Sequence, residues 1–333
     1  MADDLKTEVA AAIDDKLGKP ATLTLSEMPD CGVGEWISTG SIILNASIRR
    51  PGIPVGRLTT IAGKAASGKT TLASHLIKSA QAMGALVVFA DTEHAYDPER
   101  GARIGVNNSE LLFCQDLCLE ELFASIFSTI DVSLNTGAKR PILFVVDSHS
   151  GTATRAEVEA DPDASRAEVA SSARLTSLDL KRLISTGLLS RARVALVFIC
   201  QLKMIISTWG GGGGETYIAD RPINYHSSLI IRLTRRSEMK SGDGIVVKAK
   251  ITKNKVGPPF AVCEFELFNE DGIDDSRALL ELAVVNKLAT LKGGGYYTMG
   301  DQTFRKKEWR AMLTKDPGLR RELFGLATGM LKI

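Results

Sequence analysis

Four apolar runs of similar length recur along the first two thirds of the chain and predict buried strands. They read RLTTIAG, ALVVFAD, PILFVVDS and VALVFICQ, and stretches with the helical spacing of apolar residues separate them. Runs that are scarcely broken by polar positions are typical of parallel strands covered on both faces. The pattern therefore predicts an α/β fold, a mainly parallel twisted sheet flanked by helices, over about residues 35–269.

The two ends of the chain show different patterns. Residues 1–18 have the spacing of an amphipathic helix, and PATLTLSEMP alternates like a short strand, so residues 1–34 form a predicted N-terminal piece. Late in the core, SSLIIRLTRR, GIVVKAKITKNK and VCEFELF follow one another without helices and predict an antiparallel extension of the sheet. Residues 270–333 mix helical and strand-like stretches, which predicts a small C-terminal α/β domain.

The segment GKAASGKTT lies between the first predicted strand and a helical pattern that stops at Gly84. Its spacing matches G-x-x-x-x-G-K-[ST], in which backbone N–H groups at a helix N-terminus surround a nucleotide phosphate. Lys69 is expected to reach the β- and γ-phosphates, and Thr70 to bind Mg²⁺. A tight turn without a ligand is the alternative, which the flanking strand and helix disfavour. The other expected nucleotide contacts in the loop are Gly63, Lys64, Ala65, Ala66, Ser67, Gly68 and Thr71.

Polar residues at the ends of the other predicted strands are candidates for the rest of the site, because ligands of open α/β sheets bind beyond the carboxyl ends of the strands. Asp147 closes ILFVVD and fits the carboxylate that holds Mg²⁺ or its waters; an ordinary turn-capping aspartate is the alternative. Glu93 follows LVVFAD and is suited to orient and deprotonate the attacking water, but a surface carboxylate explains its position equally well. Gln201 ends the fourth run.

Composition and charge narrow the class of protein only slightly. The chain has 333 residues and a formal net charge of +2, so bulk charge argues neither for nor against DNA binding. The five cysteines are scattered, as expected for reduced thiols, and their spacing predicts no zinc site. No apolar run reaches membrane-spanning length and the acidic N-terminus does not resemble a signal peptide, so we expect a soluble, cytoplasmic protein.

Six strings occur in the order found in RecA-type recombinases of bacteria and phages: ISTGS, GKAASGKTT, DTEHAYDP, VVDS, FICQLKM and KITKNKVGPPF. The chain resembles that family from near residue 10 to its end. The resemblance implies a RecA-like P-loop ATPase core, with Glu93 as the catalytic glutamate and Gln201 as a glutamine that senses the γ-phosphate and links it to a DNA-binding loop. It also adds Asp97 and Arg100 to the expected nucleotide contacts.

The resemblance implies contacts between subunits as well. Lys253 and Lys255 match lysines that reach the ATP of a neighbouring subunit; without the resemblance they would be read as a solvated basic strand face. The N-terminal helix and strand resemble the element through which family members polymerise into a helical filament, with the strand completing the sheet of the next subunit. Pairing of this strand within its own chain is the alternative.

Two segments are expected to bind DNA by the same resemblance. Residues 152–172 match the first DNA-binding loop, and Arg174, Ser177 and Lys181 after it match phosphate contacts. Residues 203–224 match the second loop, whose glycine run is too flexible to become ordered without a partner. A flexible linker is the alternative. The expected DNA contacts in this loop are Lys203, Met204, Ile206 (inserted between base triplets), Trp209, Gly210, Gly211, Gly212, Gly213 and Gly214.

Departures from the usual family pattern make this a divergent member. Lys64, Ala65 and Ala66 replace Pro-Glu-Ser, and Arg100 stands where bacterial members usually have an adenine-stacking tyrosine. The resemblance nevertheless implies an ATP-dependent recombinase that forms a filament on single-stranded DNA, pairs it with homologous double-stranded DNA and exchanges strands. Two alternatives stay open: a DNA-coating filament protein with little or no hydrolysis, and a RecA-fold DNA motor.

Overall fold

The computed structural model of the protein describes residues 2–22, 33–137, 139–159, 169–204, 215–217, 220–239 and 241–329. The chain divides into two compact units, Met1–Glu35 and Trp36–Ile333. The first unit contains helix α1 (Ala2–Leu17), where the sequence predicts a helix. After the helix, Asp14 Oδ1 accepts a hydrogen bond from the Thr22 hydroxyl at 2.7 Å. Residues 23–32, with most of the predicted N-terminal strand, lie outside the described residues, and the strand stays a prediction.

The central sheet of the second unit has nine strands, in the order β13-β12-β11-β10-β3-β7-β6-β4-β5. The strands that pair in parallel are β3 (Leu58–Gly63), β4 (Leu86–Asp91), β5 (Leu111–Cys114), β6 (Ile142–Asp147), β7 (Val194–Gln201) and β10 (Leu229–Glu238). The antiparallel strands that follow β10 are β11 (Gly244–Asn254), β12 (Val262–Phe268) and β13 (Gly272–Asp274). The predicted α/β fold and its antiparallel extension are confirmed.

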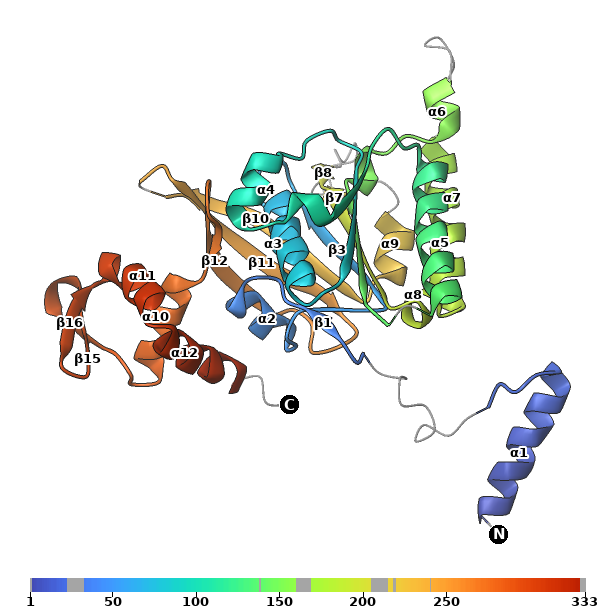
Figure 1. The fold of residues 1–333 in the computed structure, drawn as a ribbon, viewed down its shortest axis with the longest axis horizontal. Coiled ribbons are helices and arrows are strands. Elements are labelled where there is room, and N and C mark those ends of the chain that lie inside the picture. The colour runs from blue at the N-terminus through green and yellow to red at the C-terminus, as the bar shows by residue number, and fades with distance from the viewer. Residues whose placement is uncertain are drawn as a thin grey trace, which may run out of the picture. The chain divides into compact units, whose positions relative to one another are not determined.

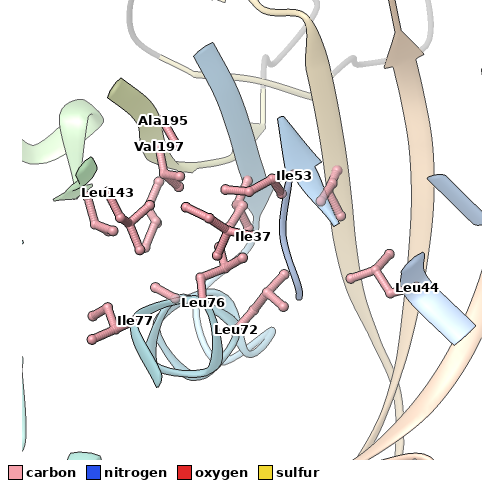
Figure 2. Packing of buried hydrophobic residues seen from close by; sticks show 14 of the residues in the cluster. Ile37, Leu44, Ile53, Leu72, Leu76, Ile77, Leu143, Ala195 and Val197 are labelled. Atoms are coloured by element: carbon pink, nitrogen blue, oxygen red, sulfur yellow. The ribbon is translucent and has the colours of Figure 1, made fainter. Parts of the chain in front are cut away.

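Helices cover both faces of this sheet, as Figure 1 shows. One hydrophobic cluster contains residues of α2 (Ile42–Ile48) and α3 (Lys69–Ala82); a second contains residues of α5 (Leu119–Thr136), α7 (Val169–Ser185), α8 (Leu188–Arg191) and α9 (Asp220–His226). Successive residues of β6 alternate between the clusters, Leu143 in the first and Phe144 in the second. In Figure 2, Leu72 and Leu76 of α3 lie near Ile37, which belongs to the same cluster. This two-sided burial explains the continuous apolar runs.

Shorter elements complete the core. They are β1 (Trp36–Ile37), β2 (Ile53–Pro54), α4 (Pro98–Ile104), η2 (Asn108–Glu110), η3 (His149–Gly151), α6 (Arg155–Glu159), β8 (Lys203–Met204) and β9 (Glu215–Thr216). Among the described residues, we find no helix with the length and apolar character needed to cross a bilayer.

The C-terminal part of the second unit has a hydrophobic core of its own, in which Trp309 is only 1% exposed. It contains α10 (Ser276–Val285), β14 (Thr290–Lys292), η4 (Gly293–Gly295), β15 (Tyr296–Met299), β16 (Gln302–Arg305), α11 (Lys306–Lys315) and α12 (Pro317–Gly329). Arg310 joins it to the central sheet through an ion pair with Asp274 of β13 at 2.5 Å. The boundaries predicted for three domains stay predictions.

His75 is a buried polar residue that joins α3 to the last strand of the sheet. Its Nε2 accepts a hydrogen bond from the backbone N–H of Ile273 at 2.8 Å. Two glycines with positive φ make room for the ring: a Cβ at Gly40 would lie 2.8 Å from Cβ of His75, and one at Gly272 would lie 2.2 Å from Nε2. Burial lowers the pKa of His75 to about 4, so the ring is a neutral acceptor at neutral pH.

The buried ring predicts a loss of stability in acid that a glutamine would remove. The unfolded chain binds a proton at the ordinary histidine pKa of 6.5 and the folded protein only at about 4, so stability falls as the pH falls between these values. His75 accounts for roughly 2 kcal/mol of the loss between pH 7 and pH 5. We expect His75→Gln, whose amide oxygen can replace Nε2 as acceptor, to lose that much less stability than the parent in urea unfolding.

His94→Gln is the matched control, because His94 belongs to the same compact unit as His75 but is exposed. The His94→Gln protein should retain the loss of stability that His75 causes between pH 7 and pH 5. Burial also lowers the pKa of His149 to about 4, but that ring is present in all three proteins, so the difference between them isolates His75. An identical pH dependence in His75→Gln and the parent would contradict a neutral, buried His75.

Candidate functional site

The glycine loop joins the end of β3 to the start of α3, where Gly68 adopts a φ of 90°. A Cβ at Gly68 would lie 2.5 Å from Cδ1 of Leu267, so both the backbone conformation and the space favour glycine here. The loop borders a cavity of about 460 Å³. Besides residues of the glycine loop and α3, the cavity is lined by Arg100, Arg235, Glu238, Gly242, Gly244, Ile245, Leu267 and Asn269. All of these except Arg100 come from β10–β12 and their connections, and the sequence did not predict them as site residues.

The side-chain ammonium group of Lys69 bonds to the backbone of the glycine loop and not to a carboxylate. Its Nζ donates a hydrogen bond to the backbone oxygen of Lys64 at 2.8 Å. Burial lowers the pKa of Lys69, while the nearby carboxylates of Asp147 and Glu93 act in the opposite direction. The ammonium group is thus held at the loop by a backbone oxygen that a phosphate oxygen could replace.

Thr70 and Asp147 meet where β6 ends beside α3. The Thr70 hydroxyl donates a hydrogen bond to Oδ2 of Asp147 at 2.6 Å. Burial raises the pKa of Asp147 to about 6, and the hydrogen bond from Thr70 opposes that rise. A hydroxyl and a carboxylate beside a phosphate loop are the hard oxygen ligands that Mg²⁺ prefers. The donor set therefore fits Mg²⁺ together with nucleotide phosphates.

Glu93 lies beyond β4 and accepts a hydrogen bond from the hydroxyl of Ser148, the residue after Asp147. The segment around Glu93 folds over a buried carboxylate that the sequence did not single out. Asp91 accepts hydrogen bonds from the backbone N–H groups of Glu93 at 3.3 Å, Ala95 at 3.2 Å and Tyr96 at 3.0 Å. Asp91 thus fixes the backbone that presents the exposed Glu93 to the site.

Gln201 ends β7, next to the end of β6. Its backbone N–H donates to Oγ of Ser150 at 2.8 Å. The structure therefore brings Gln201, Glu93 and Asp147 to one edge of the sheet, as their positions at the ends of parallel strands predict. The serines that lie between them, Ser148 and Ser150, were not candidates from the sequence.

Asp97 and Arg100 flank the start of α4. Asp97 caps the helix by accepting a hydrogen bond from the backbone N–H of Arg100 at 3.1 Å, and it does not line the cavity. Arg100 does line it, and its Nη2 donates to the Thr71 hydroxyl at 2.9 Å. The buried Nε of Arg100 has no hydrogen-bond partner within the part of the chain that the structure describes. A group bound in the cavity could satisfy this donor.

Lys253 and Lys255 lie away from the nucleotide cavity of their own chain. Lys253 is near the end of β11 and Lys255 follows it. The Nζ of Lys253 donates hydrogen bonds to the backbone oxygens of Asn224 and Tyr225, the latter at 2.9 Å. Burial lowers the pKa of Lys253, and the charge of Lys255 adds to this effect. Among the described residues, neither lysine lines the nucleotide cavity of its own chain, and their contact with a neighbouring subunit stays a prediction.

The expected DNA contacts fall into two groups. Arg174, Ser177 and Lys181 are exposed on α7 at spacings of three and four residues, which places them on one face of the helix. Lys203 is exposed in β8, and Met204 ends that strand. The remaining expected contacts lie outside the described residues: Ile206, Trp209, Gly210, Gly211, Gly212, Gly213 and Gly214. Residues 160–168 of the first predicted loop lie outside them as well.

Comparison with known proteins gives a consistent result over nearly the whole chain. A family model described as the RecA N-terminal domain matches residues 5–274. The protein named RecA from Chloroflexus aggregans is 33% identical over 317 residues, which cover 94% of this chain and 87% of the relative. RecA from Arthrobacter sp. is 34% identical with the same coverage. RecA from Streptomyces avermitilis is 33% identical over 94% of this chain and 81% of its own length.

Proposed function

The chain belongs to the RecA family, and from that premise we propose how its residues carry out the recombinase reaction. It is a DNA-dependent ATPase and strand-exchange recombinase, and its family implies ATP binding with Mg²⁺, DNA binding and filament formation. The protein polymerises on single-stranded DNA into a helical filament with ATP between subunits, pairs the bound strand with homologous double-stranded DNA and exchanges strands. Hydrolysis then releases the DNA.

The observation that carries the proposal is the meeting of Thr70 with Asp147 at 2.6 Å beside the glycine loop. These two side chains would hold Mg²⁺, which when bound neutralises charge on the phosphate oxygens. Lys69 would exchange the backbone oxygen of Lys64 for the β- and γ-phosphates. Gly63, Lys64, Ala65, Ala66, Ser67, Gly68 and Thr71 would complete the phosphate contacts, and Arg100 would lie against the rest of the nucleotide.

Hydrolysis requires a base beside the γ-phosphate, and Glu93 is the proposed one. It would accept a proton from the attacking water as the water oxygen bonds to the γ-phosphorus and the bond to the β,γ-bridging oxygen breaks. Lys253 and Lys255 of a neighbouring subunit would stabilise the charge that develops on the γ-phosphoryl group. Gln201 would contact the γ-phosphate and change the position of the DNA-binding segment that follows it.

Glu93→Gln tests the base directly. We expect DNA-stimulated ATP hydrolysis to fall about 10²- to 10⁴-fold, because the amide keeps the shape of the carboxylate but cannot accept the proton. ATP binding should persist, and filaments on DNA should last longer. Steady-state hydrolysis with single-stranded DNA and electron microscopy of the filaments would measure both effects.

Glu99→Gln is the control, since Glu99 is an exposed carboxylate six residues along the chain on α4. It should hydrolyse ATP like the parent. A Glu93→Gln protein that is as active as Glu99→Gln would move the role of base to another residue.

Joint molecules that form only with homologous duplex test the recombinase itself. Filaments without hydrolysis or joint molecules would instead favour a DNA-coating protein, and hydrolysis without joint molecules a motor.

A further inference from the structure

Three hydroxyl and amide groups connect the proposed sensor, Gln201, to the proposed base, Glu93. The backbone N–H of Gln201 donates to Oγ of Ser150 at 2.8 Å. Oγ of Ser150 lies 3.5 Å from Oγ of Ser148. The Ser148 hydroxyl donates in turn to Oε1 of Glu93. These contacts join the ends of β7, β6 and β4 in a single line.

The direction of this line follows from the number of protons available. Each serine hydroxyl has one proton. The proton of Ser148 is donated to Glu93, so only Ser150 can donate across the gap between the two serines. The oxygen of Ser150 then accepts from Gln201. Every donor in this series of hydrogen bonds therefore points toward the Glu93 carboxylate. Hydrogen bonds in such a series polarise one another.

The segment that carries both serines is held rigidly. Ser148 is fully buried and Ser150 is 6% exposed. His149 between them is stacked on Phe198 of β7 with ring centroids 4.8 Å apart, and its Nε2 lies 3.2 Å from the Thr176 hydroxyl of α7. A side chain locked by packing and hydrogen bonds can hold a neighbouring group in place. Packing therefore limits the serines to small displacements, and Glu93 is aligned against Ser148.

Gly151 also packs against Glu93 and Ser148. A Cβ at Gly151 would lie 3.3 Å from Cγ of Glu93 and 3.2 Å from Oγ of Ser148. The backbone oxygen of Ser148 also accepts hydrogen bonds from the hydroxyls of Thr92 at 2.9 Å and Thr152 at 3.1 Å. The contact between Oγ of Ser148 and Oγ of Ser150 is long at 3.5 Å, since strong hydrogen bonds between hydroxyl groups are about 2.7–2.8 Å long. A small shift of the end of β7 would therefore change this contact first.

We infer that Ser150 is a positioning residue that couples Gln201 to Glu93 through Ser148. The inference rests on the roles proposed for Gln201 and Glu93. When Gln201 meets the γ-phosphate, its backbone moves Ser150 relative to Ser148, and the Ser148 hydroxyl aligns the Glu93 carboxylate for the attacking water. Because coupling between two binding sites is reciprocal, nucleotide and DNA change each other's affinity by the same factor.

Four purified proteins test this inference: Ser150→Ala, Ser148→Ala, the double variant, and Ser133→Ala as control. Ser133 is a buried serine on α5 whose hydroxyl donates to the backbone oxygen of Ala192 at 3.0 Å, so its removal costs a comparable hydrogen bond outside the site. We expect Ser150→Ala to lower kcat of DNA-stimulated hydrolysis about three- to tenfold, the loss of one hydrogen bond, with the KM for ATP within about twofold of the parent. Ser133→Ala should keep the parental kcat.

The double variant separates a relay from two independent contacts. If Ser150 acts through Ser148, the double variant should have the kcat of Ser148→Ala alone; fold-changes that multiply would overturn the inference. DNA affinity gives a second reading: the ratio of affinities with and without a non-hydrolysable ATP analogue should fall in Ser150→Ala and not in Ser133→Ala. A parental kcat and ratio in Ser150→Ala would also overturn it. An inactive parent would contradict the proposed function instead.

Discussion

Lys69→Ala is expected to weaken ATP binding at least ~100-fold and to remove DNA-stimulated hydrolysis, because the ammonium group supplies charge-assisted bonds to both the β- and γ-phosphates. Among the described residues, the hydrogen-bond partner of this group is the exposed backbone oxygen of Lys64, at 2.8 Å, so its loss should cost the fold little. Equilibrium binding of a fluorescent ATP analogue and the rate of phosphate release would measure the two effects.

Lys78→Ala removes the same charge from a later turn of the same helix and is the matched control. Lys78 is exposed on α3, outside the nucleotide cavity. It should bind and hydrolyse ATP like the parent. Tight ATP binding by a correctly folded Lys69→Ala protein would refute the assignment of the phosphate site.

Replacing Lys253 and Lys255 together by alanine is expected to lower DNA-stimulated hydrolysis by about 10³-fold or more. This is the effect of removing a cation that acts on a neighbouring active site. ATP binding to the free subunit should be nearly unchanged, because neither lysine lines the nucleotide cavity of its own chain. The matched control is Lys248→Ala with Lys250→Ala, which removes two charges from the same strand. That control should keep most of the parental rate.

A mixing experiment decides whether these lysines act between subunits. The Lys253/Lys255 double variant and Glu93→Gln are each expected to be nearly inactive alone. In mixed filaments, some junctions join an intact Glu93 to a neighbour with intact lysines, and these should hydrolyse ATP. Mixed filaments that form on DNA but remain inactive at every ratio would show that the lysines and the glutamate do not serve one active site.

Local sequence patterns were sufficient for the fold class and the phosphate loop. The loop is a continuous segment between a strand and a helix, so its geometry depends mainly on neighbouring residues and on glycine at Gly68, where φ is 90°. The core strands were equally predictable, because burial on both faces leaves no polar position exposed in strands such as β3 and β6. The edge strand β5 was missed because it is short and its central residues, Leu112 and Phe113, are exposed.

Asp147, Glu93 and Gln201 could be predicted from the sequence to share one edge of the sheet, because parallel strands bring their carboxyl ends together. The groups that join them could not be predicted. Serine carries no periodic signal, so nothing in the sequence distinguished Ser148 and Ser150 from ordinary turn residues. His75 likewise occupies a position in α3 that reads as polar, yet it is buried and bonded to β13.

The sequence by itself determined the buried central strands, their order along the chain and the chemistry of the loop, since these depend on contacts between near neighbours in the chain. Only the tertiary structure decided the walls of the nucleotide cavity, where Leu267 and Asn269 lie beside a loop nearly 200 residues earlier. It also decided the hydrogen bonds between strand ends, such as that from Thr70 to Asp147. Such contacts depend on how distant segments cross in space, and many crossings are compatible with the same local pattern until the strands pair in one order.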